Sequence, residues 1–266
     1  GTVAVLNADM PEFDVISKAC TDRGIKIISY GHKPCDLQII EQHPTNEGQK
    51  LKLSLFGKTY ELQLSITGSF QAANIMAAVG LVVACGTELN EILATLPKLS
   101  GVPGRAEKIG QSARGGMVYV DFAHTPDAVE TIIKALRPHT ENKLSIVVGC
   151  GGDRDPGKRP LMGGIADKLA DKTYITDDNP RSEDPALIRA QAIAAAPSAI
   201  EIAGRRAAIF KAVSDLENGD LLIIAGKGHE SGQIVGDKVL PFDDRDVARE
   251  AIAQTRQEIP GGPNDR

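Results

Sequence analysis

The sequence of 266 residues has few cysteines, no long apolar run and no excess of basic charge. Its four cysteines stand at spacings that match neither a zinc site nor a disulfide framework, which favours a reducing, cytoplasmic setting. The longest apolar stretch, Ile75–Cys85, is far shorter than a membrane span, and no signal peptide is evident. A net charge of −5 offers no basic field for nucleic acid or an anionic membrane. We therefore expect small-molecule partners, neither nucleic acid nor membrane, and a monomer.

The remaining composition is ordinary for a globular protein, with 42% hydrophobic and 24% charged residues. The pattern breaks at the turn-rich stretch Ser100–Gly104, which we interpret as the boundary between domains at residues 1–100 and 101–266. The chain opens on a strand pattern without an initiator Met, so we expect it to be a piece of a longer protein.

The first domain has patterns typical of a mixed α/β fold. We predict a helix at 11–23, a strand at 25–29 and a hairpin made by 51–56 and 59–64, in which apolar and polar residues alternate. Two further helices are predicted at 71–85 and 89–96. The first of these is apolar almost all round and should be buried.

The second domain alternates apolar strands with helices, which is typical of a parallel sheet covered on both faces. The predicted strands are 117–122, 144–148, 172–176, 199–202 and 221–225. The predicted helices begin near Pro126, Pro160, Pro185, Arg205 and Asp243. The fold class is therefore α/β, with a doubly wound sheet in this domain.

One loop, Gly149–Pro160, almost matches a phosphate-binding P-loop, because Gly152 to Lys158 has the required glycine and lysine spacing. Arg159 stands where a P-loop needs a hydroxyl for Mg²⁺, acidic residues would repel phosphate, and Pro156 removes one N–H donor. These defects argue against a nucleotide P-loop. The plain alternative is a solvated turn of mixed charge.

Polar clusters follow four of the five strands, and in a parallel sheet such ends meet at the edge where ligands bind. The clusters are Asp121–Pro126, Asp153–Arg159, Asp177–Arg181 and Gly226–Glu230. Taken singly, each has a structural explanation as a helix cap, a turn or a flexible charged loop. Together they predict a binding site.

The charges of these clusters suggest the ligand. Arg154 and Arg181 offer planar forks for a carboxylate or phosphate, and Glu230 offers an anion for an ammonium group. A zwitterionic, amino-acid-like ligand would satisfy both. Cys150 lies in the same region, but no base is positioned to activate it, so we interpret it as a bystander and not a nucleophile.

An ordered series of motifs runs along essentially the whole chain: Asn7–Asp9, Gly68–Asn74, Val102–Arg105, Asp121–Pro126, Gly149–Pro160, Asp178–Arg181 and Gly226–Glu230. In this order they resemble the Mur ligase family, specifically its members that add meso-diaminopimelate. The resemblance implies a Rossmann-like C-terminal domain, preceded by the second half of the family's α/β ATPase, or central, domain. Residues 1–100 would belong to the central domain, and 101–266 would bring the amino acid.

The implied reaction is ATP-dependent amide formation in peptidoglycan synthesis, with Mg²⁺ in the full-length enzyme. The γ-phosphate of ATP would activate the terminal carboxylate of UDP-MurNAc-L-Ala-D-Glu as an acyl phosphate, which the amino group of meso-diaminopimelate attacks. The family's P-loop and carbamylated lysine would lie upstream of Gly1. The chain would then hold no catalytic or metal-binding residue and would be inactive alone.

The resemblance also implies binding roles for individual residues. The residues that would hold diaminopimelate are Arg154, Asp178, Asn179, Pro180, Arg181, Gly226 and Glu230. The residues that would contact ATP are Asn74, Arg105, Asp121, His124 and Lys158. The chain departs from the family at Gln71, where relatives usually carry Asn, and this departure puts the adenine contacts there in doubt.

Two alternatives stay open at this point. A lysine-adding or folylpolyglutamate-type ligase belongs to the same family, but Arg181 and the Gly226–Glu230 loop weigh against both. A non-catalytic amino-acid-binding module is the rival outside the class. The reading frame upstream would separate it from a ligase, because a ligase requires a true P-loop there.

Overall fold

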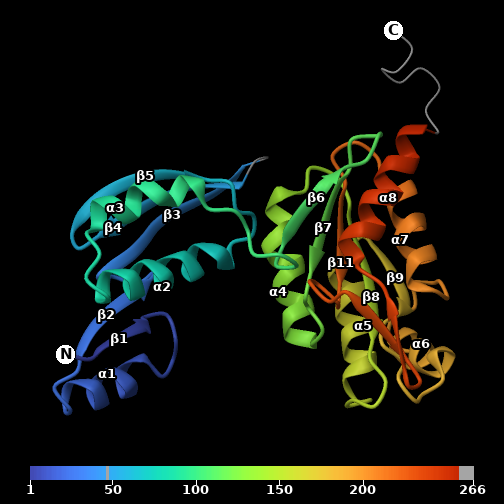
Figure 1. The fold of residues 1–266 in the computed structure, drawn as a ribbon, viewed down its shortest axis with the longest axis horizontal. Helices are drawn as coiled ribbons and strands as arrows, with labels where there is room; N and C mark the ends of the chain where they lie inside the picture. Colours follow the sequence, from blue (N-terminus) through green and yellow to red (C-terminus); the bar gives the residue numbers. More distant parts are fainter. Residues whose placement is uncertain (46–47, 258–266) are drawn as a thin grey trace, which may run out of the picture. The chain divides into compact units, whose positions relative to one another are not determined.

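The computed structural model describes residues 1–45 and 48–257, which belong to two compact units (Figure 1). The first unit is Gly1–Gly101 and the second begins at Val102, so the division falls inside the turn-rich stretch Ser100–Gly104. Within the described residues, no helix combines the length and the apolar character that crossing a membrane would require.

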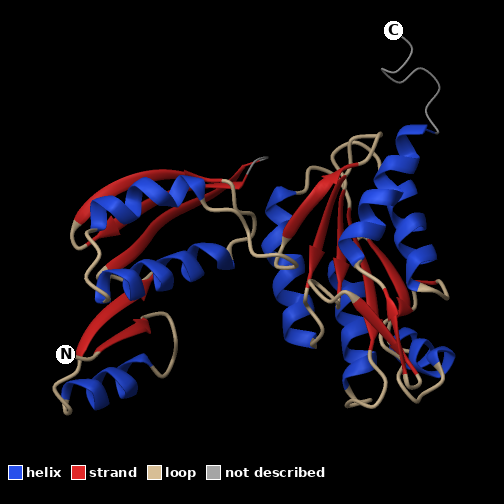
Figure 2. Ribbon diagram, in the orientation of Figure 1, coloured by secondary structure: helices blue, strands red, loops and turns tan. Residues whose placement is uncertain are grey.

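The first unit is built on a five-stranded sheet of order β1-β2-β3-β4-β5 (Figure 2). Its elements are β1 (Val3–Asn7), α1 (Phe13–Thr21), β2 (Lys26–Gly31), β3 (Leu37–Thr45), β4 (Gly48–Leu55), β5 (Lys58–Leu64), α2 (Phe70–Ala84), α3 (Leu89–Thr95) and a 3₁₀ turn, Leu96–Lys98. β1 to β3 are parallel, whereas β3 to β5 are antiparallel. The predicted hairpin is β4–β5. Its two turn residues, Phe56 and Gly57, both have positive φ, as a type I′ turn requires.

Helix α2 packs on this sheet with one face only. Ala72, Ile75 and Met76 are buried in a core that also contains Leu37 and Leu53 of the sheet. On the opposite face Leu81 and Val82 are 56% and 41% exposed, so the prediction of a helix buried all round was wrong. A helix that covers one sheet buries a single stripe, and periodicity alone does not show what lies against the rest.

The second unit is a six-stranded sheet of order β10-β9-β8-β11-β7-β6, parallel except for β6 at one edge. Its strands are β6 (Glu107–Gln111), β7 (Met117–Asp121), β8 (Leu144–Cys150), β9 (Lys172–Asp177), β10 (Ile200–Glu201) and β11 (Leu221–Ala225), with a separate hairpin, β12 (Gly232–Val235) and β13 (Lys238–Pro241). Its helices are α4 (Pro126–Leu136), α5 (Lys158–Leu169), α6 (Pro185–Ile193), α7 (Arg205–Ser214) and α8 (Asp244–Gln257), with a 3₁₀ turn, Arg137–His139.

The sheet of the second unit is covered on both faces, which confirms the predicted doubly wound fold. Helices α7 and α8 pack on each other and on one face, while α4, α5 and α6 pack side by side on the other (Figures 1 and 2). The central strands β8 and β11 are buried along their whole length, as both-sided coverage demands.

Three details differ from the predicted pattern. The edge strand β6 and the hairpin β12–β13 were not predicted, because β6 has Ile109 as its one large apolar residue and β13 is exposed along its length. Helix α5 begins at Lys158, slightly before the predicted start near Pro160. Pro160 is tolerated there because it lies in the first turn, where its missing N–H has no helical partner to lose.

Candidate functional site

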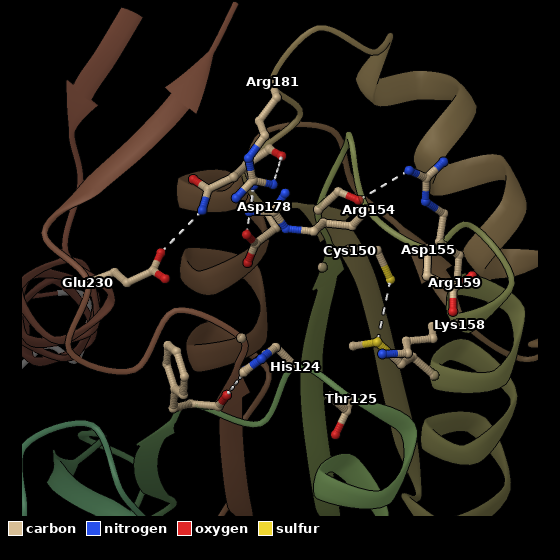
Figure 3. A pocket seen from close by; sticks show the side chains of 16 residues that line it. His124, Thr125, Cys150, Arg154, Asp155, Lys158, Arg159, Asp178, Arg181 and Glu230 are labelled. Carbon is tan, nitrogen blue, oxygen red and sulfur yellow. Dashed lines mark hydrogen bonds between the residues drawn. The ribbon is translucent and has the colours of Figure 1, made fainter.

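A cavity of about 460 Å³ opens among the described residues where the parallel strands of the second unit end (Figure 3). Eight residues that the sequence predicted for binding lie in its wall: His124, Arg154, Lys158, Asp178, Asn179, Arg181, Gly226 and Glu230. The structure therefore gathers most of the predicted site at one edge of one sheet. Which ligand each residue binds stays a prediction.

The topology of the sheet explains why a crevice opens at this place. The chain leaves β8 toward α5 on one face and leaves β11 toward α8 on the other, although β8 and β11 are neighbours. Segments that diverge to opposite faces leave a gap beyond the strand ends, where ligands of open α/β sheets bind. Gly149–Gly151 and Gly226 line this gap.

Two arginines enter the cavity from neighbouring loops (Figure 3). Arg181 follows β9 and has a left-handed backbone, with φ of 51°. Its Nη1 donates hydrogen bonds to the carbonyl oxygens of Gly152 (2.8 Å) and Asn179 (3.4 Å). Arg154 follows β8, and its Nη1 donates to the carbonyl oxygen of Asp153 at 3.0 Å. Since a guanidinium has five N–H donors, both arginines keep donors for an anion.

The two arginine loops touch closely at Gly152. A Cβ at this position would lie 1.9 Å from the carbonyl oxygen of Pro180, so no other residue fits without moving the backbone. Pro180 itself does not line the cavity. Its place in the site is to bring the Arg181 loop against the Arg154 loop.

Side-chain bonds fasten the same two loops. Arg159 is 2% exposed and donates to both carboxylate oxygens of Glu183, at 2.7 and 2.8 Å. Ser182 donates to Asp153 at 2.6 Å. The Arg159 guanidinium, helped by the amide of Asp153, lowers the pKa of Glu183 to about 2. At the position where a P-loop has a hydroxyl, Arg159 thus forms a structural ion pair with Glu183. Its side chain is buried, so it does not belong to a solvated turn.

Glu230 stands opposite the arginines and belongs to a small polar network (Figure 3). Its Oε2 accepts hydrogen bonds from Asn179 Nδ2 and from Lys227 Nζ, both at 3.2 Å. Lys227 is fully buried and also donates to Asn179 Oδ1 at 3.1 Å. The sequence drew attention to the Gly226–Glu230 cluster but assigned Lys227 no role. A lysine between two glycines was the available signal.

A second buried charge lies beneath the site. Arg205 opens α7 and donates to both oxygens of Asp244, the first residue of α8, at 2.7 and 2.6 Å. Arg205 Nη2 also donates to the carbonyl oxygen of Ala225 at 2.9 Å, and its Nη1 lies 3.7 Å from Asp178 Oδ2. Burial raises the pKa of Asp244, and the Arg205 guanidinium opposes that shift. Sequence reasoning missed this pair, although an arginine at a helix start opposes the dipole and is unusual.

The His124 side of the cavity is aromatic. The rings of His124 and Phe122 meet edge to face at 4.5 Å, and the guanidinium carbon of Arg105 lies 4.4 Å from the centre of the Phe122 ring. Asp121 does not line the cavity. Its oxygens accept hydrogen bonds from the amides of Ala106 (2.7 Å) and Ala123 (2.8 Å), and burial raises its pKa.

These positions bear on the predicted ATP contacts. The observed bonds of Asp121 join the loop that follows β7 to the segment that precedes β6. Thr125, not Asp121, caps α4 by accepting a bond from the Ala128 amide. Asn74 lies in the first unit, exposed on α2, and donates to Gln71 Oε1 at 3.0 Å. Gln71, the residue that departs from the family pattern, is buried. The ATP contacts of Asn74, Arg105 and Asp121 stay predictions.

The chemistry that the site could perform does not include a thiol nucleophile. Cys150 lines the cavity but is buried, and this burial raises the pKa of its thiol to about 12. Its Sγ lies 4.0 Å from Met162 Sδ. At neutral pH the thiol is protonated. Across residues 1–45 and 48–257, no three His, Cys, Asp or Glu side chains are grouped so as to hold a metal ion.

The fold and the site define an α/β protein with a cavity lined by charged residues at the edge of a Rossmann-like sheet. Two protein-family models extend this description. The model named "Mur ligase middle domain" matches residues 1–82, and the model named "Mur ligase, glutamate ligase domain" matches residues 104–228. The chain belongs to the Mur ligase family and carries its middle and C-terminal domains.

Individual relatives agree with this assignment. A UDP-N-acetylmuramoyl-L-alanyl-D-glutamate–2,6-diaminopimelate ligase from Caulobacter vibrioides is 48% identical over 98% of this chain. The chain spans 52% of that relative's length. A solved structure of a ligase with the same name is 34% identical and superposes with a TM-score of 0.68, covering 97% of this chain and 54% of that one. The Mycobacterium tuberculosis folylpolyglutamate synthase complexed with ADP shares the fold, at 20% identity and a TM-score of 0.67, over 84% and 52% of the two chains.

Proposed function

We propose that this chain is the amino-acid-adding part of an ATP-dependent ligase, which joins meso-diaminopimelate to UDP-MurNAc-L-Ala-D-Glu in peptidoglycan synthesis. The observation that carries the proposal is the cavity lined by Arg154, Arg181 and Glu230 (Figure 3). Its charges complement a ligand end that bears both a carboxylate and an ammonium group. The name of the Caulobacter vibrioides relative supports the same substrate.

The role of the site is to orient the amino acid. The far end of diaminopimelate would be held by the arginine forks through its carboxylate and by Glu230 through its ammonium group. The amino group at the other end would then point out of the cavity toward the activated carboxylate. Positioning of this kind accounts for much of the rate when no protein nucleophile takes part. The protonated Cys150 agrees with such a mechanism.

The bond changes of the proposed reaction are simple. ATP supplies the phosphoryl group that turns the terminal carboxylate of the UDP-dipeptide into an acyl phosphate. The deprotonated amino group of diaminopimelate forms a C–N bond to that carbonyl carbon, and the C–O bond to phosphate breaks. Inorganic phosphate leaves, and the attacking nitrogen loses one proton to solvent or a base, which gives the neutral amide.

The ATP contacts in this proposal rest on the predicted residues Asn74, Arg105, Asp121, His124 and Lys158. Of these, His124 and Lys158 line the cavity, and we propose that they contact the phosphate groups or the ribose. The described residues offer no cluster of acidic ligands that fits Mg²⁺, so we derive no step through the metal. We place the reaction in the cytoplasm, where the nucleotide-linked substrate is found, and expect a monomer.

The test of this proposal is a comparison of meso-diaminopimelate with L-lysine. Lysine has the ammonium group but lacks the second carboxylate, so it leaves the arginine forks without a partner. Calorimetric titration of the chain should show tighter binding of diaminopimelate. In Arg181→Ala the preference should fall at least about ten-fold, because a lost charge-assisted pair is worth roughly 1.5–3 kcal/mol.

The matched control is Arg206→Ala, which removes a surface arginine at the start of α7, paired with Glu250 away from the cavity. It should bind diaminopimelate as the unchanged chain does. If Arg181→Ala kept the full affinity and preference for diaminopimelate, the assignment of this substrate would be wrong. A preference for lysine in the unchanged chain would favour the lysine-adding alternative.

A further inference from the structure

Lys227 is a charged residue of the second unit with no access to solvent. Its side chain is 0% exposed, and its Nζ donates to Glu230 Oε2 and to Asn179 Oδ1. It does not line the cavity itself. An ammonium group is costly to bury unless it is paired and hydrogen-bonded, so its position behind Glu230 calls for an explanation.

The backbone fixes Lys227 in this buried position. Gly226 and Gly228 on either side have φ of 124° and 55°. A Cβ at Gly226 would lie 2.8 Å from Asp178 Oδ2, and one at Gly228 would lie 2.7 Å from Phe122 Cβ. The amide of Glu230 donates to the carbonyl oxygen of Lys227 at 2.9 Å, which closes the turn. The Lys227 side chain therefore cannot reach solvent unless the backbone of this loop changes conformation.

The bonds of Asn179 define the direction of the network. Asn179 is 4% exposed, and its Oδ1 accepts from Lys227 Nζ and from the amide of Ile234 at 2.9 Å. Both partners can only donate, so the amide orientation is fixed and Nδ2 must point to Glu230. Asn179 and Lys227 thus reach the same oxygen, Oε2. Within the described part of the chain, Oε1 of Glu230 has no protein donor, and the side chain is 39% exposed.

We propose that Lys227 is a positioning residue, which together with Asn179 binds one oxygen of Glu230 so that the other faces the ammonium group of the incoming amino acid. The inference rests on the proposed function, since it assumes that this cavity takes an amino acid. It adds that Lys227 and Asn179 act on the ligand through Glu230. Lys227 would be selective for the ammonium group and indifferent to the carboxylates, which meet the arginines on other walls.

The test uses two ligands that differ only in ammonium groups. Meso-diaminopimelate and pimelate have the same seven-carbon chain and both carboxylates, but pimelate carries no amino group. In the chain with Lys227→Met, calorimetry should show diaminopimelate affinity reduced about ten-fold or more, the cost of disturbing a charge-assisted pair. Pimelate affinity, followed by ligand-observed NMR, should change less than about two-fold. A merely structural role would weaken both ligands together.

A double-mutant cycle gives a second measure that does not depend on pimelate. In a Glu230→Gln background, adding Lys227→Met should change diaminopimelate affinity less than about two-fold, because the group through which the lysine acts has gone. The control is Lys172→Met, which removes a lysine paired with Asp215 at the opposite end of the sheet. It should leave binding unchanged. If circular dichroism shows that Lys227→Met does not fold, Lys227→Gln serves in the same experiments.

The outcomes separate the two proposals. Absence of diaminopimelate binding by the unchanged chain would overturn the proposed function, and this inference with it. Normal binding by the unchanged chain, together with full affinity in Lys227→Met, would overturn the inference alone. Equal losses for both ligands, or additive effects of Lys227→Met and Glu230→Gln, would do the same.

Discussion

Two adjacent arginines at the start of α7 show how differently one residue type can behave. Arg205 is fully buried and forms a two-bonded pair with Asp244, whose side chain is also fully buried. Arg206 pairs with Glu250, and both side chains are 54% exposed. Solvent screens the second pair, so it contributes little to stability. In the Arg205–Asp244 pair, by contrast, water cannot reach the charge that would remain if one partner were removed.

The contrast between these pairs predicts two very different mutations. Arg205→Met should destabilise the second unit by about 3–5 kcal/mol, because it leaves the Asp244 carboxylate buried without its partner. Arg206→Met should cost less than about 1 kcal/mol. Urea unfolding of both variants, followed by circular dichroism, measures the difference. Equal costs would mean that the Arg205 pair does not support the fold.

At the scale of elements, the predicted site depends on loops that are fastened to one another. The hairpin β12–β13 holds the Arg181 loop through its backbone, because Arg181 donates to the carbonyl oxygen of Ile234 and accepts from the amide of Gly236. Gln233 Nε2 adds a bond to the carbonyl oxygen of Asp178 at 2.6 Å. On the other side, Arg159 and Glu183 join the same loop to the start of α5. The arginines of the cavity thus project from a braced framework.

The Arg159–Glu183 pair should respond to acid in a defined direction. The pKa of Glu183 is lowered from an ordinary 4.5 to about 2, so its ionised form favours the folded state. Its contribution is present above pH 4.5 and is lost as the pH falls from there through about 2. Unfolding measurements at a series of pH values should show wild type more stable than Glu183→Gln at pH 7. That advantage should shrink only below about pH 4.5.

Two results would contradict this assignment. One is a stability advantage that already disappears between pH 7 and 5, which would point to another titrating group. The other is an advantage that persists unchanged to pH 2. Carbon-13 NMR of the Glu183 carboxyl should independently give a titration midpoint near 2.

The sequence predicted most elements of the second unit, and the reasons for the failures are physical. The strand before Gly226 was evident because a strand buried on both faces is almost wholly apolar. The clustering of Arg154, Arg181 and Glu230 followed from the rule that parallel strands end at one edge. Hairpin β12–β13 escaped because its exposed residues have no periodic apolar face.

Partners across the fold could not be predicted from local patterns. Arg205 and Asp244 are 39 residues apart, and nothing near either one indicates the other. The segment Gly226–Glu230 has the composition of a flexible loop, yet Lys227 within it is buried. In the first unit, the exposed Leu81 and Val82 show that an apolar helix pattern does not state which of its faces will be covered.

At the scale of the whole molecule, the 266 residues contain no intact Gly-x-x-x-x-Gly-Lys-Ser/Thr loop. The near match at Gly152–Lys158 is followed by Arg159, whose side chain turns inward to Glu183 and Gln191. The loop therefore serves the cavity wall and the brace between loops. It lacks the hydroxyl that would hold Mg²⁺ beside a nucleotide.

The chain by itself should accordingly bind an amino acid but not turn over ATP. Phosphate release measured with ATP, the UDP-dipeptide and meso-diaminopimelate should stay at the level of a sample without protein. The calorimetric binding of diaminopimelate serves as the control that the chain is folded. Phosphate release above background, dependent on diaminopimelate, would show that a catalytic nucleotide site exists within these two units.

The strand order of the second unit also governs how its sheet can form. β11 lies between β8 and β7, yet it follows β7, β8, β9 and β10 in the chain. The two halves of the sheet stay unjoined until this last parallel strand arrives and pairs with both neighbours. Pairings so distant in sequence are slow to form, and during synthesis they wait for the C-terminal part of the chain. The loop that carries Lys227 and Glu230 follows β11 directly, so assembly of the central sheet and completion of the cavity are one late event in folding.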